Sequence, residues 1–283
     1  MYTLKRVCLS HTGQINTIES SIDESKVFTG SDDNTIKIWS SSSGDLLKTL
    51  KGHILPVSKL SVDPENRWIH SVSFDGTLKT WDLQRSKNIS TGKGHRSMIS
   101  DLICDSSLIF TSSQQSEVNL WKCLDTRPFH KIITKSPVNS MILKENHLFC
   151  AMKNGLIDQI DLRNSEKVVQ SFNFRQEIIK IENFESEIFV STGNFIENLN
   201  NSLQIQNQFF IEDFTKIGSE FIFCDKNGIF SQIYDTQKLE KSDISVPGQE
   251  SLKGAKSLKI TEKWLISGHF DHSLRFWQQS NLS

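Results

Sequence analysis

The chain of 283 residues lacks the features that mark several large classes of protein. No apolar run approaches the 18 residues of a membrane-spanning helix, and the start MYTLKRVC has no long apolar core of a signal peptide. The formal net charge is only −1, so the basic excess typical of nucleic-acid-binding proteins is missing. We therefore expect an intracellular protein, cytoplasmic, nuclear or both, that binds neither membranes nor nucleic acid directly.

Cysteine is also scarce, and its spacing points to no site. The five cysteines are odd in number and widely separated, without a CxxC pair, which argues against both a disulfide framework and a zinc site. His269 and His272 are spaced like metal ligands, but they flank Asp271 in a predicted tight turn and have no second cluster nearby. We predict no metal and no cofactor.

What the chain does contain is a repeated pattern. The stretches TGSDDNTIKIW, SVSFDGTLKTW and SGHFDHSLRFW each place Ser or Thr four residues before an Asp, and that Asp six residues before a Trp. A His precedes the first two of these Asp residues by the same distance, 33 − 11 = 75 − 53 = 22. The same spacing of these residue types therefore recurs along the chain.

The pattern resembles that of the WD-repeat family, whose period is about 40 to 45 residues with Gly-His near the start and Trp-Asp near the end. The early Trp residues are spaced by 81 − 39 = 42 and 121 − 81 = 40. Weaker units follow, with Gln115 where Asp is expected, Asn154 and Ile160 at the turn and Trp positions, and Tyr234 in place of Trp. Together they make seven units.

Each unit also has the signals of short antiparallel strands. In the first unit INTI, KVFTG and TIKIW are rich in β-branched and apolar residues and are separated by polar turns. The resemblance implies an all-β fold: a seven-bladed β-propeller of four-stranded antiparallel sheets, in one domain over residues 1–283. It also implies that the N-terminal strand MYTLKRVCL joins the last blade and closes the ring, which leaves only short, protected sheet edges.

The recurring His, hydroxyl and Asp residues could be taken for hydrolase triads. The resemblance implies a structural tetrad instead, in which the indole donates to the hydroxyl, the hydroxyl bonds the His and the His bonds the Asp. A buried hydroxyl held by an indole is not an activated nucleophile. We therefore expect no enzyme and no catalytic residue, and assign to the structural tetrads His11, Thr29, Asp33, Trp39, His53, Ser71, Asp75, Trp81, His95, Thr111, Trp121, Ser267, Asp271 and Trp277.

Function is then expected on the surface. In the family, partners most often dock on the top face, at the residue before each turn Asp and at the start of each inner strand. The first class comprises Asp32, Phe74, Gln114, Lys153, Lys226 and Phe270, and the second comprises Asn16, Ser58, Ser100 and Asn139. The two Phe residues either pack against a neighbouring blade or anchor a partner, since aromatic side chains are enriched at binding hot spots. The second class forms an uncharged polar arc suited to a peptide backbone or a short side chain.

The expected function is a non-enzymatic scaffold: a subunit of a multiprotein complex that binds protein partners or peptides and no small-molecule substrate. The alternative is a recognition module for peptides or degradation motifs, such as a ubiquitin-ligase substrate receptor. Such a receptor typically ends a repeat in Trp-Asp-x-Arg, of which residues 160–163, Ile-Asp-Leu-Arg, are a degraded version. A phosphoinositide-binding propeller is disfavoured because the run Asn-Phe-Arg-Gln at 173–176 lacks the second Arg of that signature. The diverged fifth and sixth units, with Phe209 and Phe210, reflect either drift or a side held by a permanent partner.

Overall fold

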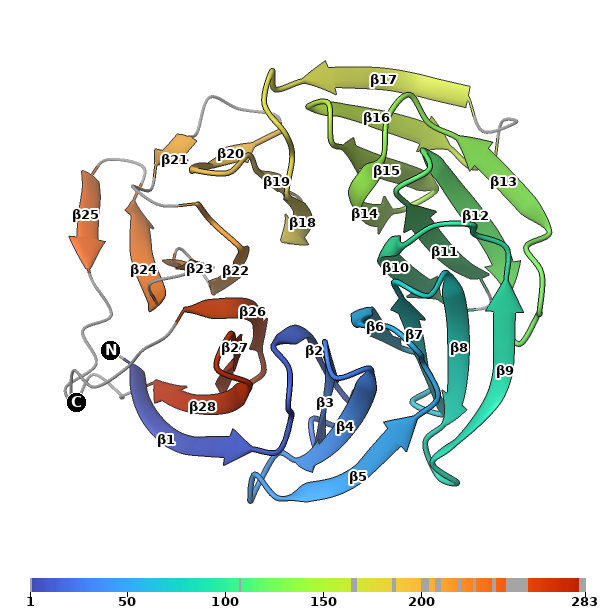
Figure 1. The fold of residues 1–283 in the computed structure, drawn as a ribbon. Coiled ribbons are helices and arrows are strands. Elements are labelled where there is room, and N and C mark those ends of the chain that lie inside the picture. The colour runs from blue at the N-terminus through green and yellow to red at the C-terminus, as the bar shows by residue number, and fades with distance from the viewer. Residues whose placement is uncertain are drawn as a thin grey trace.

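The described part of the chain consists of strands joined by turns and loops. The computed structural model describes residues 2–106, 108–163, 167–184, 187–199, 204–206, 210–217, 220–225, 228–235, 238–242 and 254–279. Their strands form seven sheets, each of four antiparallel strands, set side by side around a common centre (Figure 1). The predicted all-β propeller of four-stranded antiparallel sheets is confirmed. Nowhere in these residues is there a helix with the length and hydrophobicity needed to span a membrane.

We number the sheets as blades 1 to 7 in chain order, and give the strands of each from the centre outward (Figure 1). Blade 1 has β2 (Ile15–Ser20), β3 (Lys26–Ser31), β4 (Thr35–Ser40) and β5 (Leu46–Lys51). Blade 2 has β6 (Val57–Val62), β7 (Trp68–Ser73), β8 (Thr77–Asp82) and β9 (Lys87–Lys93). Blade 3 has β10 (Ile99–Asp105), β11 (Leu108–Ser113), β12 (Glu117–Lys122) and β13 (His130–Ile133). Blade 4 has β14 (Val138–Lys144), β15 (His147–Met152), β16 (Leu156–Asp161) and β17 (Lys167–Asn173).

The remaining blades follow the same order. Blade 5 has β18 (Lys180–Phe184), β19 (Glu187–Ser191), β20 (Phe195–Asn198) and β21 (Gln204–Gln206). Blade 6 has β22 (Asp213–Ile217), β23 (Glu220–Asp225), β24 (Gly228–Asp235) and β25 (Lys238–Ser242). Blade 7 has β26 (Ala255–Ile260), β27 (Leu265–His269), β28 (Ser273–Gln279) and, from the start of the chain, β1 (Tyr2–Leu9).

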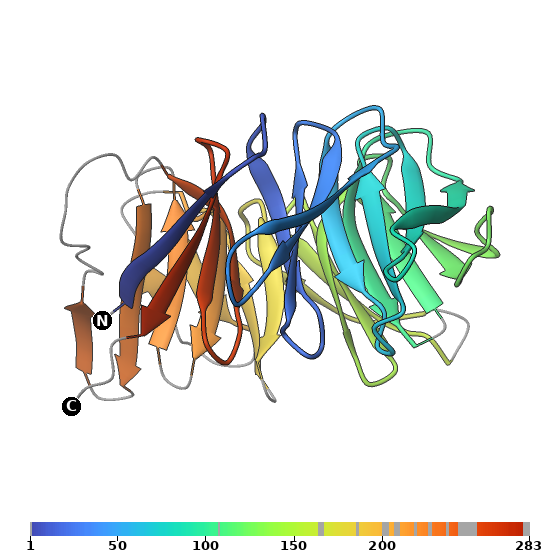
Figure 2. The ribbon, with the colours of Figure 1, turned by 90° about the horizontal axis from the view of Figure 1, so that it is seen from below.

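Blade 7 is built from both ends of the chain. β1 runs antiparallel to β28, in a register that pairs Tyr2 with Gln279 and Leu9 with Ser273. Seen from the side, β1 crosses the outer face of blade 7 beside β28 (Figure 2). The pairing covers a strand edge that would otherwise expose unpaired backbone N–H and C=O groups.

The hydrophobic core lies between neighbouring blades. At the junction of blades 1 and 2, for example, Phe28, Ile38 and Leu50 of one blade pack against Leu60 and Trp81 of the next. Side chains alternate between the two faces of a strand, so each blade offers one apolar face to each neighbour. Burial of this kind, at about 25 cal/mol per Å² of apolar surface, is the main force that holds the blades together.

The tight turns between the second and third strands share one end of the ring, which we call the top face. Asn34 and Gly76 lie in two of these turns with positive φ values of 66° and 75°, a conformation that Asn and Gly accept most easily. The loops that lead into the inner strands reach the same end, because the Phe74 N–H donates to the Pro56 carbonyl. The top face therefore gathers both classes of residue that the repeat pattern singles out.

Candidate functional site

A buried hydrogen-bond relay links strands and turn in blade 1. The Trp39 indole donates to Thr29 Oγ1 at 2.8 Å, and that hydroxyl lies 2.7 Å from His11 Nε2. His11 Nδ1 is 2.6 Å from a carboxylate oxygen of Asp33. The second Asp33 oxygen accepts from the backbone N–H and the hydroxyl of Thr35, which fixes the turn.

Blade 2 repeats this relay. The Trp81 indole donates to Ser71 Oγ at 2.8 Å, Ser71 Oγ lies 2.8 Å from His53 Nε2, and His53 Nδ1 lies 3.0 Å from Asp75. The same four residue types therefore occupy the same four places in two consecutive blades.

The electrostatics of the relay favour a neutral His and a charged Asp. Burial lowers the pKa of His11, against the opposing effect of its hydrogen bond to Asp33. Burial alone would raise the pKa of Asp33, but hydrogen bonds from His11 and Thr35 hold it well below its usual range. A neutral His11 donates through Nδ1 and accepts the Thr29 proton at Nε2, so every polar group in the relay has a partner.

Blade 3 keeps the relay with a different acid. His95 Nε2 contacts Thr111 Oγ1 at 2.7 Å, and the Trp121 indole donates to the same oxygen at 2.8 Å. His95 Nδ1 lies 2.9 Å from Glu117, whose other oxygen accepts from Lys131 Nζ at 2.7 Å. Counting from Thr111 had pointed to Gln115, whereas counting from His95 gives 117 − 95 = 22, the spacing of the first two blades. The longer Glu side chain fills the place of the Asp.

Blade 7 departs further from the pattern. The Trp277 indole donates to Ser267 Oγ at 2.7 Å, but the imidazole beside that hydroxyl is His269 of the same strand, at 2.7 Å. Asp271 is held by Arg275, a buried guanidinium 2.6 Å away, and accepts from Ser273. His269 is buried while His272 is exposed, so the two His side chains have different environments.

Apolar residues take the relay positions in blades 4 and 5. The strand register places Cys150 and Ile160 of blade 4, and Val190 and Leu199 of blade 5, where blade 1 has Thr29 and Trp39. In blade 6 the register puts Gln232 opposite Phe221, in the Trp position, so the expectation for Tyr234 was wrong by two residues. Asn154 caps the blade 4 turn as expected, since its side chain accepts the Leu156 N–H at 3.2 Å.

The relay geometry does not suit hydrolysis. The hydroxyls of Thr29, Ser71 and Thr111 are on residues with no solvent exposure, and each is occupied by an indole donor and an imidazole. A nucleophile must reach its substrate and be free to attack it. These hydroxyls join two strands and a turn within a blade.

The polar arc at the start of the inner strands has a structural use that the sequence did not reveal. Each of its four side chains donates to a backbone carbonyl at the start of the next blade's inner strand. The donors and acceptors are Asn16 to Val57 (3.1 Å), Ser58 to Ile99 (2.7 Å), Ser100 to Val138 (2.5 Å) and Asn139 to Ile178 (2.8 Å). Asn16 also donates to Asp32 at 2.7 Å. The arc that was expected to be free for a peptide backbone thus ties blades 1 to 5 together.

Beyond blade 5, charged side chains make hydrogen bonds that link neighbouring blades. Lys180 Nζ bonds Asp213 and, at 3.2 Å, the Phe214 carbonyl, while Asp213 accepts the Leu258 N–H of blade 7 at 2.8 Å. Burial opposes the charge on Lys180, but Asp213 and Glu182 raise its pKa above its ordinary value. The ammonium therefore stays charged between these carboxylates.

The residues before the turns differ in their accessibility. Phe74 is 38% exposed and Lys153 is exposed, whereas Gln114 is half-buried. Phe270 is half-buried, with the Lys256 ammonium 5.9 Å from the ring centroid. Lys226 and Phe209 lie outside the described residues, and Phe210 is 46% exposed. Of the two predicted anchors Phe74 and Phe270, Phe74 is the more exposed.

Three more apolar side chains lie with Phe74 on the top face, although the repeat pattern did not single them out. Ile54 and Leu55, in the loop that bonds the Phe74 turn, are 77% and 46% exposed, and Met98 at the start of blade 3 is 44% exposed. We call Ile54, Leu55, Phe74 and Met98 the top-face apolar group. The signal was available in the sequence, because Ile54 and Leu55 follow His53 in a loop where other units carry polar or small residues.

The repeat is also recognised by comparison with known families. Residues 2–40 and 44–82 each match the family described as WD domain, G-beta repeat. These two segments are WD repeats within a β-propeller. The two matched segments contain the relays of blades 1 and 2, so the family match and the hydrogen-bond geometry concern the same residues.

Curated relatives of the propeller share its repeats over short stretches. Pre-mRNA-splicing factor PRP46 of Saccharomyces cerevisiae is 33% identical over 73 residues, which is 25% of this chain and 16% of the relative. PRP46 of Candida glabrata is 39% identical over 71 residues, 25% of this chain and 17% of the relative. WD repeat-containing protein 86 of Homo sapiens is 42% identical over 48 residues, 17% of this chain and 13% of the relative. The matches thus span less than a fifth of each relative.

Proposed function

We propose that this chain is a non-enzymatic protein-interaction scaffold, a subunit of a multiprotein complex whose partners dock on the top face. The proposed platform is a single domain over residues 1–283, a seven-bladed ring closed by the pairing of β1 with β28. The top-face apolar group is the observation that carries the proposal. It consists of four exposed apolar side chains at the top of blades 2 and 3.

Exposed apolar and aromatic side chains at one place on a surface are typical of interaction sites. Leu55 and Phe74 also sit on well-fixed backbone, because Ser73 Oγ donates to the Leu55 carbonyl at 3.0 Å and the Phe74 N–H donates to the Pro56 carbonyl at 3.0 Å. Anchors held in place lose little conformational freedom on binding, which favours affinity. Asp32, Gln114 and Lys153 would form part of the polar rim around them.

The relatives agree with this class of function. Two of them are named pre-mRNA-splicing factors and a third is named only for its WD repeats. An intracellular location, in the nucleus or the cytoplasm, fits a relationship to splicing factors. We also propose that the chain contacts neither nucleic acid nor membranes directly and has no small-molecule substrate.

The test is quantitative affinity purification from native cells with a top-face variant and a matched control. The variant Leu55→Ser with Phe74→Ser removes two exposed apolar side chains of the top-face group. The control Leu46→Ser with Leu47→Ser removes two side chains of similar exposure from the outer strand β5. Both proteins must have melting temperatures close to that of the wild type.

We expect stoichiometric partners that bind the wild type and the control and are lost from the top-face variant. Partners retained by all three proteins would refute docking at this group. Capture of a short degradation motif in place of folded partners would favour the alternative, a recognition module such as a ubiquitin-ligase substrate receptor.

A further inference from the structure

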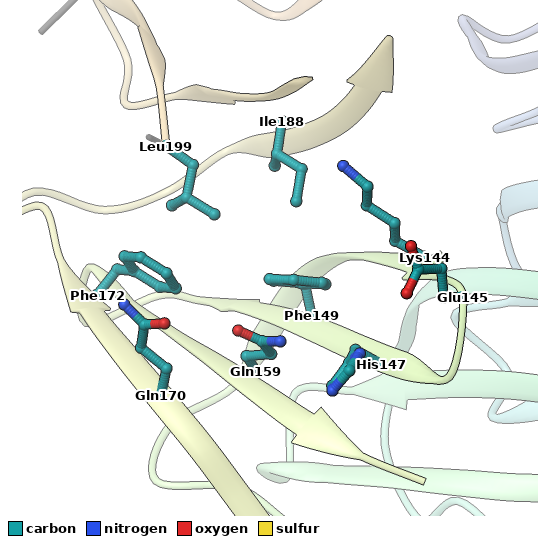
Figure 3. A pocket seen from close by; sticks show the side chains of 9 residues that line it. All are labelled: Lys144, Glu145, His147, Phe149, Gln159, Gln170, Phe172, Ile188 and Leu199. Atoms are coloured by element: carbon teal, nitrogen blue, oxygen red, sulfur yellow. The ribbon is translucent and has the colours of Figure 1, made fainter. Parts of the chain in front are cut away.

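A cavity of about 260 Å³ opens between blades 4 and 5, away from the top face. Ile188 and Leu199 of blade 5 face Phe149 and Phe172 of blade 4 across it, and polar side chains line its rim (Figure 3). We call this cavity the blade 4/5 socket; it is lined by Phe149, Gln159, Gln170, Phe172, Ile188 and Leu199, together with Lys144, Glu145 and His147.

Leu199 occupies the position that a Trp holds in blades 1, 2, 3 and 7. Its N–H donates to the Ile188 carbonyl, just as Trp39 is paired with Val27 in blade 1. At the junction of blades 1 and 2, the Trp81 ring packs against Phe28 and Ile38 of the preceding blade. The socket is the corresponding place three junctions further round, between blades 4 and 5, with a Leu where the indole would be.

Lack of a Trp is not enough to open a cavity. Blade 4 has Ile160 in the same position, but there Phe110, Leu120 and Ile132 of blade 3 close on it and Ile160 is only 2% exposed. In the socket the residue equivalent to Leu120 is the polar Gln159, which the register places opposite Phe149. Gln159 and Leu199 are both half-buried, so this junction stays accessible to solvent.

The size and lining of the socket suit an aromatic ring. An apolar protein cavity of about 150 Å³ is large enough to take up benzene, and the socket exceeds that volume. Phe149 and Phe172 can pack against a ring in edge or offset geometry, which stabilises the contact beyond the burial of area. The carboxamides of Gln159 and Gln170, paired across β16 and β17, supply donors and acceptors beside it.

The strand beside the socket can hold a peptide. β17 is the outermost strand of blade 4 and carries Gln170 and Phe172 of the socket. Its outer edge has no partner strand among the residues that the structure describes. An extended peptide can bind such an edge through main-chain hydrogen bonds while a neighbouring pocket takes one of its side chains.

We propose that the blade 4/5 socket binds an aromatic side chain, the indole of a tryptophan in particular, presented by an extended segment of a protein partner. We choose an indole because four blades of the same propeller bury an indole of their own at the equivalent position. The socket is separate from the top-face apolar group, so the proposal stands independently of the proposed function.

N-acetyl-tryptophanamide, which joins an indole to two peptide amides, is the probe for a calorimetric titration of the full chain. We expect it to bind the wild type and N-acetyl-alaninamide not to bind. Leu199→Trp should fill the socket from within, lower the affinity for the probe at least tenfold and raise the melting temperature by about 2 °C. Ile160→Trp is the matched control: the same residue enters the same strand position where no cavity exists, so overpacking should lower the melting temperature while binding persists.

A second pair of variants keeps the test decisive if Leu199→Trp fails to fold. Phe172→Ala removes one wall and should weaken probe binding at least tenfold, whereas Val169→Ala, an exposed change on the same strand, should leave it unchanged. Failure of the wild type to bind the probe would overturn the proposal. So would binding that neither Leu199→Trp nor Phe172→Ala weakens, since the probe would then bind elsewhere. Binding of free indole without binding of N-acetyl-tryptophanamide would replace the peptide partner with a small aromatic molecule.

Discussion

Blades 1 to 3 and blades 4 to 5 have the same backbone plan but different means of support. In blades 1 to 3 a buried chain of hydrogen bonds runs from a Trp indole through a hydroxyl and a His to an acid. In blades 4 and 5 Cys150 and Val190 replace the hydroxyl, and Ile160 and Leu199 replace the Trp. Both sets form complete four-stranded sheets.

Apolar packing between neighbours is enough to form a blade, and we expect the hydrogen-bond relay to make a blade rigid. Apolar faces packed between neighbours are present at every junction and account for the fold, whereas the relay is present in only some blades. Buried polar groups with all partners satisfied specify one arrangement, while apolar packing alone tolerates substitution. We therefore expect a junction without the relay to be less ordered although its blade still forms, and at the junction of blades 4 and 5 the polar Gln159 together with Leu199 leaves the socket open.

The largest effect is expected from turning a relay blade into a relay-free one. Trp81→Leu copies Leu199 into blade 2, removes most of a buried ring and leaves Ser71 without its indole donor. We expect a loss of about 3 kcal/mol in the free energy of unfolding, measured by urea denaturation. The control Ile160→Leu, at the same position of blade 4, should cost less than about 1.5 kcal/mol. Equal losses in the two variants would contradict the comparison.

A pH effect of similar size is expected from His70, which occurs in blade 2 where blade 1 has Phe28. Burial lowers the pKa of His70 to about 4, below the roughly 6.5 of an unfolded His. Between these values the unfolded chain binds the proton and the folded chain does not. The stabilisation is therefore fully present above about pH 6.5 and is lost as the pH falls toward 4, by about 3 kcal/mol at most.

The double variant His70→Phe with Thr80→Ile copies Phe28 and Ile38 of blade 1 and removes the 3.0 Å hydrogen bond between His70 and Thr80. Urea unfolding at pH 4.5 and pH 7 should show a smaller pH effect for the variant than for the wild type. An unchanged pH effect would show that His70 is not the group responsible.

An intermediate effect is expected when the acid of the relay is removed. Asp75→Ala deprives the buried His53 Nδ1 of its acceptor and frees the Ile54 N–H, which Asp75 also accepts. An unsatisfied buried donor costs about 1 to 3 kcal/mol, so the melting temperature should fall. Asn154→Ala, at the same turn of relay-free blade 4, removes one cap and no His partner and should cost less. An unchanged melting temperature for Asp75→Ala would contradict the structural role of the relay.

The smallest effect concerns the substitute acid of blade 3. Glu117→Gln keeps an oxygen that accepts from His95 but loses the ion pair with Lys131, whose side chain is 41% exposed. Exposed ion pairs contribute little, so we expect a change below about 1 kcal/mol in the free energy of unfolding. A loss as large as that of Asp75→Ala would mean that the charge, and not the hydrogen bond, supports the relay.

The sequence allowed the fold to be predicted because several different features of the repeat indicate the same strands and turns. Strand signals, turn residues and the spacing of Trp39, Trp81 and Trp121 agree with one another, and the structure has the strands where they were expected. The substitute Glu117 was missed because the unit was counted from Thr111, while the spacing from His95 would have found it.

Contacts between blades could not be predicted in the same way. Asn16, Ser58, Ser100 and Asn139 bond carbonyls that lie about 40 residues further along the chain, and a single repeat does not show where its neighbour's carbonyls point. The socket is a second case. Ile160 and Leu199 both replace a Trp, and only the facing residues of the preceding blade decide which junction closes.

Hydrogen exchange of the native wild-type chain, followed by mass spectrometry, tests most directly whether relay blades are the rigid part of the ring. Amides exchange through local openings whose free energies report the stability of each segment. We predict slower exchange for β3, β7 and β11 of blades 1 to 3 than for β15 and β19 of blades 4 and 5. Equal protection in the two groups, or slower exchange in β15 and β19, would contradict the account.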